Sequence, residues 1–175
     1  MYRERCEKTR RKFVSRINRI SEKNLIYVDE AGIEECLYRE YARSPMGQIV
    51  TGRISGKKFE RTNLIAGLCL GRWVAPRQYN CSTDSELVEF WFEHCLLKEI
   101  KRGKFIIWDN ASFHRKTRLT ELAAIKNCKI IFLPAYSPDL NPIEKKWANL
   151  KQKLRDILPN FVSLDDALWS VFQVD

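Results

Sequence analysis

Long apolar runs and closely paired cysteines are both missing from this sequence, and each absence excludes a class of protein. The longest apolar runs, such as residues 64–70 and 105–108, are far shorter than the roughly 20 residues needed to cross a bilayer. The first twelve residues are rich in Lys and Arg, and no apolar stretch follows them as it would in a secretory signal. We therefore expect no membrane span and a cytoplasmic location.

The cysteines do not form a metal-binding or disulfide pattern. Six are scattered along the chain without a CxxC pair, which disfavours a zinc ribbon or a disulfide framework. His94 and Cys95 are neighbours in sequence and could not easily bind one ion together. We expect reduced cysteines that fill the core and no structural zinc.

Length and charge limit the remaining choices. With 175 residues, of which 45% are hydrophobic, the chain can form one domain with its own core. Lys and Arg total 31 and Asp and Glu total 22, which leaves a net charge of +9. This excess predicts a polyanionic partner, although a nucleic acid, an acidic protein and an anionic lipid surface would fit it equally.

The N-terminal part of the sequence predicts a basic helix and then antiparallel strands. In residues 3–21, Phe13, Ile17 and Ile20 share one helical face and most other positions are cationic, which suits a solvated face and a DNA-contacting face alike. Residues 25–28 read as a buried strand that ends at Asp29 and Glu30. A half-exposed strand at 36–42, a turn at 45–47 and a hairpin of residues 59–70 and 73–79 should follow.

From residue 83 the pattern changes to alternating helices and short buried strands. Ser82 or Thr83 can cap a helix, and continuous apolar strands at 105–108 and 129–133 flank a helix at about 113–126. Further helices begin at Pro142 and at residue 163. The sequence thus predicts an α/β fold with a mixed sheet, antiparallel hairpin strands first and parallel βαβ strands afterwards. We expect a single domain over residues 1–175, with flanking helices at 3–21 and 163–174.

Three acidic residues stand where ligands gather in such folds. Asp29 and Asp109 each follow a predicted strand, and Glu144 lies in the first turn of a helix. Carboxylates brought together at one sheet edge repel each other, and a divalent cation such as Mg²⁺ or Mn²⁺ would offset their charge. The same residues have structural interpretations: Asp109 could form an Asx turn, Asp29 a turn before Gly32, and Glu144 a capping box with Asn141.

The longer motifs around these acids resemble the catalytic domain of mariner-like transposases, in their bacterial insertion-sequence branch. The matching segments are Tyr27-Val28-Asp29-Glu30-Ala31-Gly32, Trp108-Asp109-Asn110-Ala111-Ser112-Phe113-His114, and Leu133-Pro134-Ala135-Tyr136-Ser137-Pro138-Asp139-Leu140-Asn141-Pro142-Ile143-Glu144, with Trp147. Thirty-four residues separate Asp109 from Glu144, a spacing similar to that of this superfamily. The resemblance covers residues 25 to about 157 and implies a ribonuclease H-like fold.

The resemblance also implies an activity. Asp29, Asp109 and Glu144 would be the DDE ligands of two Mg²⁺ or Mn²⁺ ions for DNA strand cleavage and strand transfer at transposon ends and target DNA. Asn110 and His114 would be accessory, although His114 could equally cap a helix or pack. We expect Arg115, Lys145, Lys146 and Lys151 to bind DNA, with the chain acting as a homodimer near the bacterial nucleoid.

One departure from that family leaves alternatives open. Complete transposases of this type carry N-terminal helix-turn-helix modules, and the 24 residues before the first predicted strand leave no room for them. We expect a separate subunit or an upstream reading frame to supply them, or the chain to be a remnant. A stand-alone ribonuclease H-like nuclease or integrase, and a catalytically lapsed DNA-binding or dimerisation module, are the alternatives.

Overall fold

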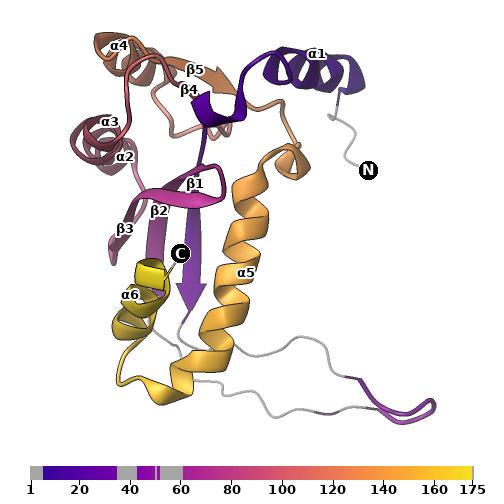
Figure 1. Ribbon diagram of the computed structural model, residues 1–175. Coiled ribbons are helices and arrows are strands. Elements are labelled where there is room, and N and C mark those ends of the chain that lie inside the picture. The colour runs from indigo at the N-terminus through magenta and orange to yellow at the C-terminus, as the bar shows by residue number, and fades with distance from the viewer. Residues whose placement is uncertain (1–5, 35–42, 50, 52–60, 175) are drawn as a thin grey trace.

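The computed structural model describes residues 6–34, 43–49, 51 and 61–174 (Figure 1). The strands are β1 (Leu25–Glu34), β2 (Arg61–Cys69), β3 (Arg72–Tyr79), β4 (Phe105–Trp108) and β5 (Lys129–Phe132). The α-helices are α1 (Glu7–Ile17), α2 (Ser85–Trp91), α3 (Leu97–Glu99), α4 (Lys116–Ile125), α5 (Pro142–Ile157) and α6 (Leu164–Val174). Short helical segments are η1 (Glu22–Asn24), the π-helical η2 (Phe92–Leu96), η3 (Pro138–Leu140) and η4 (Leu158–Asn160).

The five strands form one mixed sheet in the order β3-β2-β1-β4-β5. β1 pairs antiparallel with β2, and β2 with β3, whereas β1 pairs parallel with β4, and β4 with β5. The β2–β3 hairpin turns at Leu70 and Gly71, which both have positive φ angles as a two-residue hairpin turn requires. The predicted order of antiparallel strands followed by parallel strands is confirmed.

The first strand is longer than predicted, and this corrects the expected position of Asp29. β1 continues to Glu34 because it keeps pairing with β2, where Asp29 lies opposite Ala66. Its pairing with β4 ends at Tyr27, opposite Ile107. Asp29 is therefore a residue within a strand and not a turn residue, but it stands just past the point where the neighbouring strand has stopped pairing.

Two layers of helices cover the sheet, and β1 alternates between them. Ile26 and Val28 pack with α2, η2 and α4 in one hydrophobic cluster, while Ile33 packs with α5 and α6 in a second. A third cluster joins Phe13 and Ile17 of α1 to residues of β1, β4 and β5. Figure 1 shows α5 running along the sheet with α6 beside it, and α1 at the end where α5 begins.

Most predicted helices are observed with shorter bounds. α1 is confirmed within residues 3–21, and its predicted apolar face is buried at Phe13 and Ile17. The first residue of α2 is Ser85, and its cap is Asp84, which accepts a hydrogen bond from the Leu87 amide at 2.9 Å, so the prediction of Ser82 or Thr83 was wrong. A hydroxyl farther upstream cannot reach the free amides of this first turn.

Other expectations have mixed outcomes. The turn at 45–47 is confirmed by a backbone hydrogen bond from Gln48 to Pro45. The strand predicted at 36–42 and Cys36 lie outside the described residues. The interpretation of the cysteines as core residues is confirmed for Cys128, which is buried, and was wrong for Cys6 and Cys81, which are exposed; Cys69 and Cys95 are partly buried and pack against the core. No helix in the described part of the chain is both long and apolar enough to cross a bilayer.

Candidate active site

The three acidic residues singled out from the sequence line one cavity. Asp29, Asp109 and Glu144 surround a space of about 420 Å³. Residues from the segment between β5 and α5 complete its wall. They are Leu133, Pro134, Ala135, Tyr136, Ser137, Pro138 and Asn141, together with Asn110 and Ala111 after β4. The cavity therefore combines side chains from β1, from the end of β4 and from the start of α5.

Strand pairing explains how β1 and β4 bring two of these acids together. β4 ends at Trp108, and a backbone hydrogen bond from Leu133 to Trp108 at 2.7 Å carries its pairing with β5 to that last residue. Asp109 then leaves the sheet beside β1, where Asp29 is free of a β4 partner. The parallel arrangement thus places a residue after a strand next to a residue within a strand.

Glu144 enters the cavity from the first turn of α5. Asn141 precedes this helix, but its side chain makes no capping hydrogen bond, and its buried Oδ1 has no hydrogen-bond partner among the described residues. The capping box that offered a purely structural role for Glu144 is therefore not formed. α5 is held on the sheet by Ile143, Trp147 and Leu150, which are all buried.

Asp29 carries the strongest electrostatic perturbation in the cavity. Asp29 is only 7% exposed. Burial and, after it, the negative charges of Glu144, Glu30 and Asp109 together raise the pKa of Asp29 to about 8. A carboxyl with this pKa is largely protonated at neutral pH, and a cation bound beside it would favour its ionised form.

Asp109 is held differently, by one backbone hydrogen bond and by a contact with His114. Its Oδ1 accepts a hydrogen bond from the Ala111 amide at 3.1 Å, so the Asx turn expected as a structural alternative is present. The same Oδ1 lies 3.1 Å from Nδ1 of His114. Burial alone would raise the pKa of Asp109, but these contacts outweigh it and lower the pKa. The structural and functional interpretations of Asp109 are therefore compatible.

His114 lies between two carboxylates. Its side chain is fully buried, and its Nε2 lies 3.4 Å from Oε1 of Glu30. Trp108 donates a hydrogen bond from Nε1 to the same Glu30 oxygen at 3.2 Å. Burial would lower the pKa of His114, but Asp109 and Glu30 raise it to about 9. This pKa favours the protonated ring at neutral pH, with one ring nitrogen beside each carboxylate.

Glu30 was not predicted as a site residue. It follows Asp29 in β1, and because side chains alternate along a strand, the two carboxylates point to opposite faces of the sheet. Among the described residues, the set whose candidate ligand atoms all lie within 4.8 Å of one another is Glu30, Asp109 and His114. The adjacent Asp-Glu pair was the signal in the sequence, but only the fold shows that Glu30 faces His114.

The four cations predicted to bind DNA do not line the acidic cavity. Arg115 lies near two carboxylates of α2, 3.6 Å from Glu89 and 3.9 Å from Glu86. Lys145 and Lys146 line a separate cavity of about 400 Å³, and the Lys146 ammonium lies 5.5 Å from the centre of the Trp73 ring. Lys151 is half-buried farther along α5.

Comparisons with known proteins identify the fold. The Mos1 transposase paired-end complex with the left transposon end superposes with a TM-score of 0.65 at 20% identity, covering 86% of this chain and 48% of that chain. The Mos1 mariner paired end complex with Mn gives 0.66 at 16% identity, covering 95% and 56%. The catalytic domain of Mos1 mariner transposase gives 0.57 at 16% identity, covering 97% and 86%.

These superpositions confirm the ribonuclease H-like fold expected from the sequence. The chain spans about half the length of the Mos1 chains in the paired-end complexes, and most of the length of the Mos1 catalytic domain. No curated protein sequence matches this chain. The family model described as DDE superfamily endonuclease matches residues 24–166, a span that contains every strand and the whole acidic cavity. The resemblance drawn from the motifs is confirmed, and the chain belongs to the DDE superfamily endonuclease family.

Proposed function

We propose that this chain is the catalytic domain of a transposase that cleaves DNA strands and joins them to target DNA with the help of divalent metal ions. The observation that carries the proposal is that Asp29, Asp109 and Glu144, from three separate elements, line a single cavity. The family membership supports nuclease chemistry. The Mos1 structures with transposon ends and with Mn or Mg support DNA and these metals as its partners.

The residues of the cavity fit a hard divalent cation. The three acids offer carboxylate oxygens, the donors that Mg²⁺ and Mn²⁺ prefer. The charge repulsion at Asp29 is the kind that a bound cation relieves. We assign Asp29, Asp109 and Glu144 as the ligands. His114 is better suited to orient Asp109, because both of its ring nitrogens face carboxylates and its raised pKa keeps it protonated.

The protein side chains have separate roles in this proposal. Bound divalent cations would supply Lewis acidity to activate a water molecule or a 3′-hydroxyl and to stabilise the leaving oxygen. Asp29, within β1, and Asp109, directly after β4, would hold the cations, and Glu144 would complete the ligand set from α5. Glu30 and His114 hold Asp109 from the other side of the sheet. The wall at 133–138 shapes the space beside the carboxylates.

A DNA nicking and joining assay tests the proposal. Supercoiled plasmid and labelled duplex ends are incubated with Mg²⁺, with Mn²⁺ and with Ca²⁺, and both nicked and joined products are quantified. Asp109→Asn and Glu144→Gln should each reduce nicking by at least about 100-fold, since metal positioning contributes several kcal/mol to such reactions. Asp165→Asn, which changes a carboxylate at the start of α6, is the matched control and should keep wild-type activity.

The products distinguish the alternatives. Metal-dependent joined products indicate a transposase or integrase, whereas cuts without joining indicate a simple nuclease. Equal nicking by the wild type and both cavity variants would contradict the assignment of the site. Absence of any nicking by a wild-type protein that binds DNA would favour a catalytically lapsed DNA-binding module.

A further inference from the structure

α1 packs on the core through one narrow face. Phe13 and Ile17 are buried in the cluster that contains Leu25, Ile107 and Ile131, which belong to β1, β4 and β5. Arg10, one turn before Phe13, is also buried, with 8% of its surface exposed. The helix is therefore fixed to the rim of the sheet at the edge where β4 and β5 lie (Figure 1).

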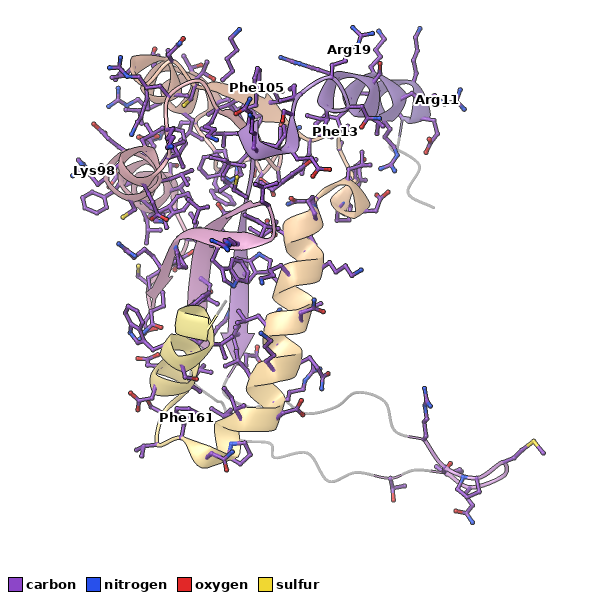
Figure 2. All side chains as sticks on the ribbon, viewed as in Figure 1. Arg11, Phe13, Arg19, Lys98, Phe105 and Phe161 are labelled. Atoms are coloured by element: carbon purple, nitrogen blue, oxygen red, sulfur yellow. The ribbon has the colours of Figure 1, made fainter. Side chains whose placement is uncertain are left out.

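The remaining faces of α1 and the turn after it are strongly cationic. Exposed cations at five positions surround the buried stripe: Lys8, Arg11, Lys12, Arg16 and Arg19. Within residues 6–34, 43–49, 51 and 61–174, none of these five forms an ion pair. Arg11 and Arg19 lie on the outer side of α1 (Figure 2). This surface, which we name the α1 basic face, carries positive charge that the described fold leaves uncompensated.

An ion pair ties α1 to the wall of the acidic cavity. Arg10 donates hydrogen bonds from its two terminal nitrogens to the two carboxylate oxygens of Asp139, at 2.9 and 2.5 Å. Asp139 belongs to η3, and its neighbour Pro138 lines the cavity together with Ser137 and Asn141. Leu140 packs against the same cluster as Phe13. Because a bidentate pair fixes orientation as well as distance, α1 has a defined position relative to the cavity.

We propose that the α1 basic face binds the sugar–phosphate backbone of duplex DNA and holds it beside the acidic cavity. The inference rests on the proposed function, because it assigns a second contact for the same DNA substrate. The acidic cavity itself repels phosphates when no metal is bound, so most of the attraction for DNA must come from elsewhere on the protein. Arg115 and Lys146 contribute less, because carboxylates lie near the Arg115 guanidinium and the Lys146 ammonium lies over the Trp73 ring.

The chemistry of α1 favours DNA over an anionic membrane. An interfacial helix inserts its apolar face among the lipids, but the apolar face of α1 is covered by the sheet. What remains exposed is a set of long cationic side chains, which suit contacts to successive phosphates. Membrane binding is accordingly an outcome that the experiment must exclude.

The experiment measures the salt dependence of DNA binding without catalysis. Binding of a fluorescent 30-bp duplex is followed by anisotropy in EDTA, over a series of NaCl concentrations. The α1 variant combines Arg11→Gln, Lys12→Gln and Arg19→Gln. The matched control combines Lys98→Gln, Lys101→Gln and Arg102→Gln, three exposed cations at α3 and the turn after it, where Lys98 lies on the other side of the molecule from Arg11 (Figure 2). Both variants lose the same net charge.

If the α1 basic face binds DNA, the slope of log K against log[salt] should fall in magnitude by about 2 to 3 in the α1 variant, since each phosphate contact contributes about 0.9. The control should keep the wild-type slope. Equal slopes in the two variants, no binding of duplex DNA by the wild type, or retention by anionic vesicles in place of DNA would each overturn the proposal. Circular dichroism and the melting temperature verify that both variants are folded.

This binding assay is independent of the proposed chemistry. A wild type that binds through α1 but neither nicks nor joins DNA would contradict the transposase function and leave the α1 contact intact. If the wild type nicks DNA but the α1 variant binds DNA like the control, the nuclease function stands and the α1 contact is contradicted.

Discussion

His114 Nδ1 lies 3.1 Å from Asp109 Oδ1, while Nε2 of the same ring lies 3.4 Å from Glu30 Oε1. The imidazolium therefore joins a carboxylate of the cavity to one on the opposite face of the sheet. Because the ring is packed against Trp108 and Phe113, it cannot rotate freely. The His114 ring therefore holds a fixed position beside the Asp109 carboxylate.

Replacing His114 should cost stability as well as activity. His114→Gln removes a buried positive charge and leaves Asp109 and Glu30 facing each other without it. We expect the free energy of unfolding at pH 7 to fall by roughly 2 to 3 kcal/mol, measured by urea denaturation. Nicking should fall too, because Asp109 loses its orientation. A variant with wild-type stability would show that the His114 contacts contribute nothing net.

The His114 contribution should also depend on pH in a defined direction. Its pKa is about 9 in the fold against 6.5 for an unperturbed histidine. The stabilisation is therefore complete below about pH 6.5 and is lost as the pH rises through about 9. Urea denaturation at pH 6, 7.5 and 9.5 should show the difference between the wild type and His114→Gln shrinking. A constant difference would contradict a charged His114.

Replacing Asp29 should raise stability and abolish activity, whereas replacing His114 should lower both. Its pKa is raised to about 8, so the stability contribution linked to its proton is complete below about pH 3.8 and is lost as the pH rises through about 8. At pH 8.5 the buried Asp29 carboxyl is mostly ionised, which destabilises the fold. Asp29→Asn removes this ionised group and should raise the free energy of unfolding at pH 8.5 in EDTA by on the order of 2 kcal/mol. The same variant should lose nicking activity.

Added metal provides the counterpart of the Asp29 experiment. Mg²⁺ or Mn²⁺ should raise the melting temperature of the wild type, because a ligand that binds only the folded state stabilises it. Asp29→Asn should show little or no rise. An Asp29→Asn protein that is less stable than the wild type in EDTA would contradict the inference that the ionised Asp29 carboxylate destabilises the metal-free fold.

The ion pair between Arg10 and Asp139 should couple α1 to the cavity wall. Arg10→Gln and Asp139→Asn should each lower the melting temperature and reduce nicking several-fold, because the segment at 133–141 loses an anchor. The double variant should lose little more than either single variant, since contacting partners are not additive. Full additivity in the double-mutant cycle would show that the two side chains act independently.

The position of Glu144 depends on how tightly α5 is packed on the sheet. Trp147, which is 3% exposed, lies 4.5 Å from Trp73 between ring centres. Trp147→Ala should reduce the free energy of unfolding by about 3 to 5 kcal/mol, as large-to-small changes in a core do. Trp169→Ala is the control, because Trp169 on α6 is 60% exposed and should cost much less. Denaturant unfolding of both variants compares these losses.

Much of the fold was predictable from local patterns. The continuous apolar runs at 105–108 and 129–133 gave the parallel strands, and the spacing of Phe13 and Ile17 gave the buried face of α1. Errors occurred where pairing partners matter: the end of β1 was misplaced, because a polar residue such as Asp29 stays in a strand when a neighbour continues the hydrogen bonding. The residues around Asp29 in the sequence do not indicate that β2 pairs with β1 as far as Glu34.

The sequence by itself determined which three acids to follow, because each lies next to a predicted apolar strand or at the start of a predicted helix. Tertiary structure decided that these side chains line a common cavity, that Glu30 contacts His114 on the face of the sheet opposite Asp29, and that Arg10 reaches Asp139 from 129 positions away. The physical reason is that spacing fixes the direction of a side chain relative to its own helix or strand. The partner that it meets depends on how those elements pack.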